Sequence, residues 1–185
     1  MAYDDTISKH VAKGGSREFV IKHIPKIPGI AITMPHMNFI FEKELERQHW
    51  KVNFIEREKA VYEYQHLLHG SNKSFKTHHT TVSKYLVNTN EKISYGWLDF
   101  TGAMCEDTLL ILLATRAPVI AITLAMTRQI SFKSVYKDKG DDAGLALLFS
   151  LARYKEIERF AYKNEVSGMP FCTFILHKTK YNASK

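Results

Sequence analysis

Short apolar runs alternate along the chain with longer stretches in which apolar residues recur at helical spacing. The runs that are typical of strands are residues 29–34, 51–55, 93–98, 119–124 and 171–176. Near-continuous apolar strands of this kind occur in sheets that are covered by helices on both faces. The pattern therefore predicts a three-layer α/β fold with a mostly parallel sheet and right-handed crossovers.

The stretches between the early runs are shorter and more polar. Asn38 can cap a helix in which Ile40, Phe41 and Leu45 share one face. Residues 79–82 contain β-branched side chains, which favour a short strand. We therefore expect a helix after the first strand and a weak strand before the run at residue 93.

Three further segments predict helices. Residues 57–69 have an apolar face at helical spacing, made of Ala60, Val61, Tyr64, Leu67 and Leu68. Residues 105–116 are rich in leucine, and residues 143–162 form a long helical pattern that Asp141 or Asp142 can cap. The resulting alternation of strands and helices supports the α/β prediction.

The net charge indicates a class of partner, and the length indicates the number of domains. The chain carries 26 Lys and Arg residues against 19 Asp and Glu residues, a formal charge of +7. This surplus favours an anionic partner, nucleic acid first, although a basic surface also aids solubility. Cys105 and Cys172 are too few for a disulfide framework, so we expect buried thiols. The polar segment 1–16, with its two adjacent glycines, is predicted to be a flexible arm, and residues 17–185 a single domain.

One apolar run ends in a group that can do chemistry. Asp99 follows the run at 93–98 and precedes Phe100, Thr101 and a glycine. In a parallel sheet, ligands bind beside the loops that follow the carboxyl ends of the strands. Asp99 is therefore predicted to lie at such a binding edge. The alternative is a structural carboxylate that is bonded by the free amides after it.

Four segments resemble a known family. Gly29–Met34 is similar to the first strand and loop of class I S-adenosylmethionine-dependent methyltransferases, and Val119–Leu124 to their fifth strand. Glu56 matches the acidic residue that closes the second strand, and Asp99–Gly102 matches the loop that holds the catalytic motif. The likeness is one of layout and extends over residues 29–178. It implies a single Rossmann-like α/β domain.

The resemblance also implies S-adenosylmethionine as cofactor and a set of residues around it. Gly29, Thr33 and Pro35 would belong to the first strand and its cofactor loop. Glu56 would accept hydrogen bonds from both ribose hydroxyls, as acids do in dinucleotide sites. Its alternative role is to start the next helix, where an acid is favourable. Thr81 stands where the family often has an acid that reads the adenine amino group.

The same resemblance assigns the reaction to the loop after the fourth strand. Asp99 would contact the cofactor and orient the accepting group, and Phe100 would lie beside it as a second catalytic-loop residue. The family's first loop is rich in glycine, whereas residues 33–38 of this chain contain none. That difference keeps a second hypothesis open, a protein that kept the fold and lost the cofactor.

A basic segment provides candidate nucleic-acid contacts. Between residues 128 and 139, cations that can track phosphates alternate with aromatic rings that can stack on bases, and the candidates are Arg128, Lys133, Tyr136, Lys137 and Lys139. The alternative is a solvated loop. A separate group of histidines, His66, His69, His78 and His79, lacks completing ligands nearby in the sequence, so we predict no metal.

Two functional hypotheses follow. The first is an S-adenosylmethionine-dependent methyltransferase that acts on RNA or DNA. The second is a non-catalytic, methyltransferase-like binding protein that docks nucleic acid or a protein partner through its basic edge. No apolar stretch approaches the ~20 residues of a membrane span, so we expect a cytoplasmic protein without a membrane partner. The small basic chain would suit a viral origin, with the host cytoplasm as its location.

Overall fold

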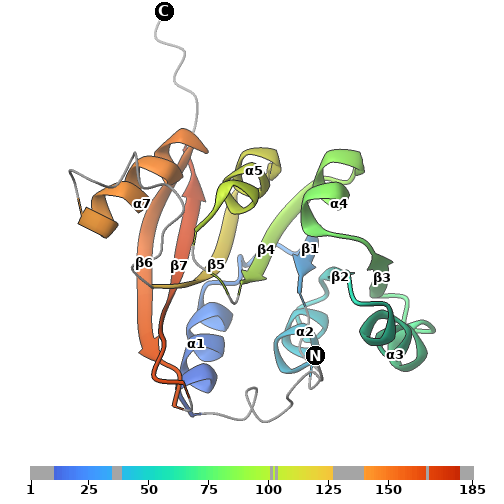
Figure 1. The fold of residues 1–185 in the computed structure, drawn as a ribbon. Coiled ribbons are helices and arrows are strands. Elements are labelled where there is room, and N and C mark those ends of the chain that lie inside the picture. Colours follow the sequence, from blue (N-terminus) through green and yellow to red (C-terminus); the bar gives the residue numbers. More distant parts are fainter. Residues whose placement is uncertain are drawn as a thin grey trace, which may run out of the picture.

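The structure is a computed structural model that describes residues 11–34, 39–100, 102, 104–126, 140–165 and 167–179 (Figure 1). Its elements follow the chain in the order α1 (Val11–Lys22), β1 (Ile30–Thr33), α2 (Ile40–Arg47), β2 (Lys51–Glu56), α3 (Lys59–His69), β3 (Phe75–His79), α4 (Val82–Asn88), β4 (Ile93–Asp99), α5 (Glu106–Ala114), β5 (Val119–Ala125), α7 (Gly140–Leu151), β6 (Tyr154–Lys163) and β7 (Pro170–Lys178). This alternation confirms the predicted α/β class.

The strands form one sheet in the order β3-β2-β1-β4-β5-β7-β6. Strands β1 to β5 are parallel, and β7 is inserted antiparallel between β5 and β6. The mostly parallel Rossmann-like sheet is therefore confirmed. Because β1 lies between β2 and β4, the loops after these three strands meet at one edge, which we call the carboxyl edge.

Helices cover both faces of the sheet (Figure 1). Helices α4, α5 and α7 pack on one face, where Leu112, Phe149 and Phe174 belong to the larger apolar cluster. Helices α1, α2 and α3 lie on the other face, where Tyr95 and Trp97 are buried in a second cluster. Among the described residues, no helix is both long enough and apolar enough to cross a membrane.

The long helix predicted over residues 143–162 is wrong in its second half. Helix α7 ends at Leu151, and Arg153 has a left-handed backbone with φ 62°. Residues 154–163 then form β6, which pairs antiparallel with β7 at the edge of the sheet. An edge strand with one solvated face does not carry the continuous apolar run of a buried strand, so it was missed.

Two other predicted boundaries differ from the structure. Residues 11–16, expected in the flexible arm, belong to α1, where Gly15 lies so close to the ring of Phe160 that an added Cβ would come within 2.9 Å of it. The weak strand predicted at 79–82 lies earlier, as β3, because the Thr81 hydroxyl caps α4. Residues 1–10 lie outside the described residues.

The helices after β1 and β2 also differ in detail. The N-cap of α2 is Phe39 in a left-handed conformation, and the predicted cap Asn38 lies outside the described residues. Ile40 is exposed, whereas Phe41 and Leu45 are buried as expected. Helix α3 exposes most of its predicted apolar face and buries Gln65 instead, so that part of the prediction is wrong.

Candidate functional site

Two carboxylates flank the end of β1 at the carboxyl edge of the sheet. Thr33 on β1 is level with Phe54 on β2 and with Trp97 on β4. Glu56 and Asp99 each follow two residues later, so both lie just beyond the end of β1, one on either side. This edge is where ligands bind in open α/β sheets.

Glu56 is buried, and its neighbouring backbone fixes one of its oxygens. Its Oε1 accepts a hydrogen bond from the backbone N–H of Glu58 at 2.8 Å. Helix α3 begins at Lys59 with Glu58 as its N-cap, so Glu56 precedes the helix by three residues. Glu56 therefore ends β2, and through the Glu58 amide one of its oxygens also stabilises the start of α3, as the structural alternative expects.

Partly buried Asp99 belongs to a charge cluster that also contains Arg17 and Glu42, both buried. Arg17 on α1 is 6% exposed, and Glu42 on α2 is 2% exposed. The Thr33 hydroxyl donates a hydrogen bond to Oε1 of Glu42 at 2.9 Å, which connects α2 to the end of β1. Burial lowers the pKa of Arg17, while the negative charges of Glu42 and Asp99 raise it. The negative charges of both carboxylates therefore act on the Arg17 guanidinium, and the cluster joins α1, α2 and the end of β4 electrostatically.

A chain of buried hydroxyls holds α1 over this cluster. Ser16 Oγ and Thr173 Oγ1 lie 2.7 Å apart, and Thr173 Oγ1 and Thr123 Oγ1 lie 2.9 Å apart. The indole Nε1 of Trp97 donates to Thr123 Oγ1 at 3.1 Å. Because Ser16 precedes Arg17, these bonds fix the helix that carries the guanidinium.

Tyr162 on β6 borders the same region. Burial raises the pKa of the Tyr162 phenol, and the negative charge of Asp99 raises it further. The phenol is therefore a neutral hydrogen-bonding group beside Asp99 at ordinary pH. Sequence reasoning missed Arg17, Glu42 and Tyr162, because nothing in their local patterns indicates that they converge on β4.

The remaining cofactor candidates are dispersed. Thr33 lies in the site, whereas Thr81 is exposed at the end of β3 and uses its hydroxyl to accept from the Lys84 N–H at 3.3 Å. Gly29, expected beside the cofactor, does not lie at this edge. It precedes β1 at the opposite edge of the sheet, where an added Cβ would lie 2.5 Å from Ser94 Oγ. We therefore assign Gly29 a packing role.

Other predicted residues fall beside the site or outside the description. Phe100 directly follows Asp99, donates its N–H to the Thr123 carbonyl at 3.1 Å and packs partly against the core. Pro35 and the basic candidates, Arg128, Lys133, Tyr136, Lys137 and Lys139, lie outside the described residues. Cys172 is buried as expected, while Cys105 is partly exposed with its Sγ 3.3 Å from Thr108 Oγ1.

The four histidines are distributed over both faces of the sheet. His66 Nδ1 lies 3.0 Å from Thr77 Oγ1, and His79 stacks on Tyr62. His69 packs among aromatic rings under α3, and His78 lies in the polar network on the α4 side. Within the described ranges, no group of three or more His, Cys, Asp or Glu residues is arranged to hold a metal ion.

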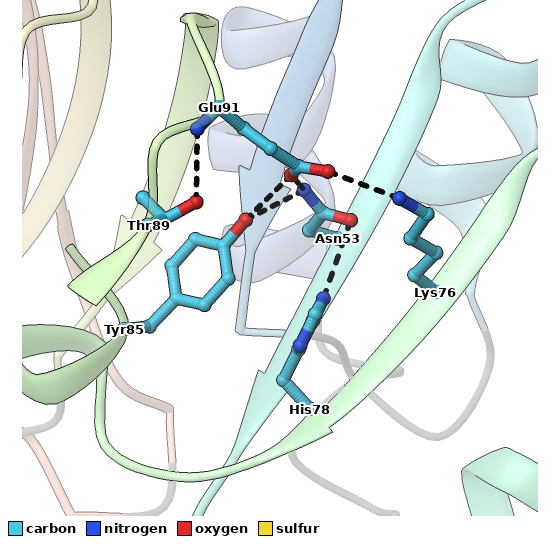
Figure 2. A network of polar contacts seen from close by, with 6 residues as sticks. All are labelled: Asn53, Lys76, His78, Tyr85, Thr89 and Glu91. Atoms are coloured by element: carbon cyan, nitrogen blue, oxygen red, sulfur yellow. Dashed lines mark hydrogen bonds and ion pairs between the residues drawn. The ribbon is translucent and has the colours of Figure 1, made fainter.

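A second polar network lies beneath α4, away from the carboxyl edge (Figure 2). Buried Asn53 on β2 donates from Nδ2 to the Tyr85 hydroxyl at 2.7 Å and also to Glu91. Tyr85 in turn donates to Glu91 Oε2 at 2.9 Å, and Lys76 Nζ donates to Oε1 at 3.0 Å. Burial raises the pKa of Tyr85 to about 12. These bonds join β2, β3 and α4 and serve the fold.

We expect the free energy of unfolding to fall as pH falls below about 6.5, the ordinary histidine pKa. Burial lowers the pKa values of His69 and His78, so the unfolded chain binds protons in this range that the native chain does not. Urea unfolding at several pH values between 5.5 and 7.5 measures the slope of the free energy of unfolding against pH. Replacing both histidines with glutamine should flatten it, whereas His177→Gln at an exposed position should not. An unchanged slope in the double variant would refute the assignment.

No protein-family model matches the sequence, and no curated protein matches it. Solved structures do match. A 1,6-didemethyltoxoflavin-N1-methyltransferase from Burkholderia thailandensis, crystallised with S-adenosylhomocysteine, superposes with a TM-score of 0.70 at 11% identity, over 95% of this chain and 82% of that one. The N-methyltransferase NodS from Bradyrhizobium japonicum, also with S-adenosylhomocysteine, gives 0.66 at 9% identity, over 97% and 94%.

An rRNA methylase from Streptococcus thermophilus gives a TM-score of 0.57 at 15% identity, over 92% of this chain and 98% of that one. These similar proteins act on different classes of substrate, small molecules and RNA. The chain has the fold of class I S-adenosylmethionine-dependent methyltransferases, which confirms at the level of fold the resemblance predicted from the sequence layout.

Proposed function

We propose that this protein is an S-adenosylmethionine-dependent methyltransferase. The observation that carries the proposal is the position of Glu56, a buried carboxylate that closes β2 beside the loop after β1. One oxygen is already engaged by the Glu58 N–H, which orients the group at the edge where ribose hydroxyls are bound in such sheets. The fold supports the same conclusion.

The charge cluster supports a cofactor with a positive centre. S-adenosylmethionine supplies an electrophilic methyl group on a sulfonium cation. Asp99 ends β4 and Glu42 bonds to Thr33 at the end of β1, so two carboxylates lie where the sulfonium would be bound, and attraction to them would favour the cation. Asp99 orients the accepting group, and α1 shields the cluster from water. Catalysis then rests mainly on placing the acceptor in line with the methyl group.

Glu56→Ala should weaken S-adenosylmethionine binding by about 10- to 100-fold, because hydrogen bonds to a charged group contribute roughly 1.5–3 kcal/mol. Isothermal titration calorimetry with S-adenosylmethionine and S-adenosylhomocysteine measures this. Glu58→Ala is the matched control, since it removes the same charge two residues away from an exposed side chain. Equal affinities in wild type and Glu56→Ala would remove the ribose assignment, and no binding by the wild type would remove the proposed activity.

We also propose nucleic acid as the substrate class. The formal charge of +7 supports an anionic substrate, and the cations at residues 128–139 follow β5, whose carboxyl end shares an edge with Asp99. An RNA methylase is among the proteins of similar fold. The accepting group would then be brought to Asp99 by contacts between these cations and the phosphates.

Replacing Lys133, Lys137 and Lys139 together with alanine should weaken RNA binding. Each lost phosphate contact should lower the slope of log affinity against log salt by about one unit. Fluorescence anisotropy with a labelled RNA and a labelled DNA at several salt concentrations measures both quantities. The control is alanine at Lys51, Lys73 and Lys92, three exposed lysines near the amino ends of β2, β3 and β4. If both triple variants weaken binding equally, binding reflects net charge and the basic segment is not the contact.

One sequence observation favours the second candidate function, a binding protein without the cofactor. The sequence of residues 33–38 contains no glycine, a composition unlike that of the glycine-rich loop whose backbone approaches the cofactor in the methyltransferase family. Calorimetry separates the two functions. Nucleic-acid binding that persists in a wild-type protein without affinity for S-adenosylmethionine would establish this second function.

A further inference from the structure

Helices α5 and α7 expose leucines on the side that faces away from the sheet. Their inner faces bury Leu112 and Phe149 in the core. On the outer faces, Leu110 and Leu113 of α5 are 57% and 50% exposed, and those of α7, Leu147 and Leu151, are 40% and 58% exposed. A helix that is apolar on all sides is normally covered on all sides. The sheet covers the inner faces of α5 and α7, and no described part of this chain covers these outer leucines.

These exposed leucines form part of a broader surface. Helix α5 contacts both α4 and α7, and Figure 1 shows the three helices in a row along one face of the sheet. The outer side of α4 adds exposed Val87 to the four leucines. We call Val87, Leu110, Leu113, Leu147 and Leu151 the outer apolar surface. Large exposed apolar side chains that gather on neighbouring helices are typical of interaction sites.

Charges of opposite sign lie at the two ends of this surface. Both helices run from the carboxyl edge back to the amino ends of the strands. Exposed Glu106 and Asp107 lie in the first turn of α5. At the other end, Arg116 follows α5, Arg153 follows α7, and Lys178 ends β7. One end of the surface is therefore acidic and the other is basic.

The basic end contains cations that repel one another. Burial lowers the pKa of Lys178, and the neighbouring charges of Arg153 and Arg116 lower it further. The Lys178 ammonium also donates a hydrogen bond to the Thr115 carbonyl, which holds it beside the end of α5. Exposed Arg116 and the held Lys178 ammonium therefore give this end a positive potential that is complementary to carboxylates.

We propose that the outer apolar surface binds a second copy of this chain in a two-fold symmetric dimer. A two-fold axis perpendicular to α5, near Leu110 and Leu113, places the two α5 helices antiparallel. Glu106 and Asp107 at the start of α5 and Arg116 after its end lie at similar distances from this axis. The acidic start of each α5 therefore faces Arg116 of the other copy. The same patch serves both copies, as a closed two-fold interface requires. The leucines form the apolar centre and the charges form the rim.

This arrangement leaves the candidate site accessible. The charge cluster of Arg17, Glu42 and Asp99 lies at the carboxyl edge, beneath α1 and α2 on the opposite face of the sheet. Each copy would therefore carry its own complete site. The dimer does not depend on whether the protein binds S-adenosylmethionine.

Sedimentation equilibrium of the full chain tests the proposal. The wild type should be a dimer at about 10–100 μM protein, in the range of moderate affinities. Leu113→Lys should weaken dimerisation by about 100-fold or more, because the change occurs twice at the centre of the interface. Leu67→Lys on α3 is the matched control, since Leu67 is 83% exposed on the other face and should leave the dimer intact. A wild type that stays monomeric over this range would overturn the proposal.

A charge exchange tests the orientation of the two copies. The variants Glu106→Lys/Asp107→Lys and Arg116→Glu/Arg153→Glu should each dimerise weakly alone, because like charges then meet at both ends. Mixed in equal amounts, they should form a heterodimer, because every facing pair again has opposite signs. Circular dichroism verifies that each variant is folded. Two variants that do not associate when mixed would overturn the antiparallel arrangement, as would unchanged self-association of either variant.

Discussion

Asp99→Asn should leave the fold nearly intact and lower methyl transfer by about 10²-fold or more, the scale of loss when an acceptor is no longer correctly placed. The substitution keeps the size of the side chain, removes its charge and replaces one acceptor oxygen with an NH₂ donor. Arg17 retains Glu42 as a counter-charge, so the buried guanidinium is not left unpaired. A radiolabelled methyl-transfer assay on RNA and DNA measures turnover, and thermal unfolding measures stability.

The charge-matched comparison is Glu42→Gln, which removes the other carboxylate of the same cluster. Glu42 bonds to Thr33 on the inner side of the cluster, whereas Asp99 ends a strand at the binding edge. Asp99→Asn should therefore impair turnover much more than Glu42→Gln. Equal losses would mean that both residues act through the net charge of the cluster. A large loss of stability with normal turnover in the folded fraction would make Asp99 a structural residue.

Arg17→Met should destabilise the protein by about 3–5 kcal/mol, because it removes a buried guanidinium whose charge interacts with buried Glu42 and partly buried Asp99. Typical domains have about 5–15 kcal/mol of stability, so the variant should unfold at much lower urea concentration. Arg17 is 6% exposed and is held over Asp99 and Glu42 by the hydroxyl chain that begins at Ser16. Urea unfolding followed by circular dichroism measures the change.

A double variant separates the charge effect from lost packing. Arg17→Met/Glu42→Gln removes one carboxylate together with the guanidinium, so it should recover part of the stability that Arg17→Met loses. The double-mutant cycle with Glu42→Gln gives the coupling free energy directly. If the two substitutions change the free energy of unfolding additively, the attraction between Arg17 and Glu42 contributes little. The stability lost in Arg17→Met then arises from lost packing.

The strands with two buried faces could be predicted from the sequence because their signal is local. A strand that is covered on both sides needs a continuous apolar run, and the run 51–55 that ends at Glu56 reappears as β2. Glu56 and Asp99 each follow such a run. Because the carboxyl ends of parallel strands lie at the same edge of the sheet, their positions at the carboxyl edge could be predicted as well. The edge strand β6 was missed because one of its faces is solvated.

Helix α3 shows where helical spacing alone is ambiguous. Its sequence has two faces with this spacing, an aliphatic one that includes Leu67 and Leu68 and an aromatic and polar one that includes Tyr62, Gln65 and His69. The structure turns the second face inward, where the His69 ring packs edge-on against rings from the first loop and from β2 and β3. Which face of α3 packs on the sheet depends on the side chains of the partner strands, and the spacing of apolar residues within one helix carries no information about them.

The α/β class, the buried strands and the two acidic residues at their ends can be predicted from the sequence alone, because each depends on a contiguous stretch of chain. The further groups that meet at this edge depend on the packing of distant elements. Arg17 interacts electrostatically with Asp99 across 82 positions and with Glu42 across 25. These interactions exist because α1 packs on β6 and β7 while α2 packs on β2, and the sheet places β4 between them. The strand order is a property of the whole sheet, and so is the charge cluster that it assembles.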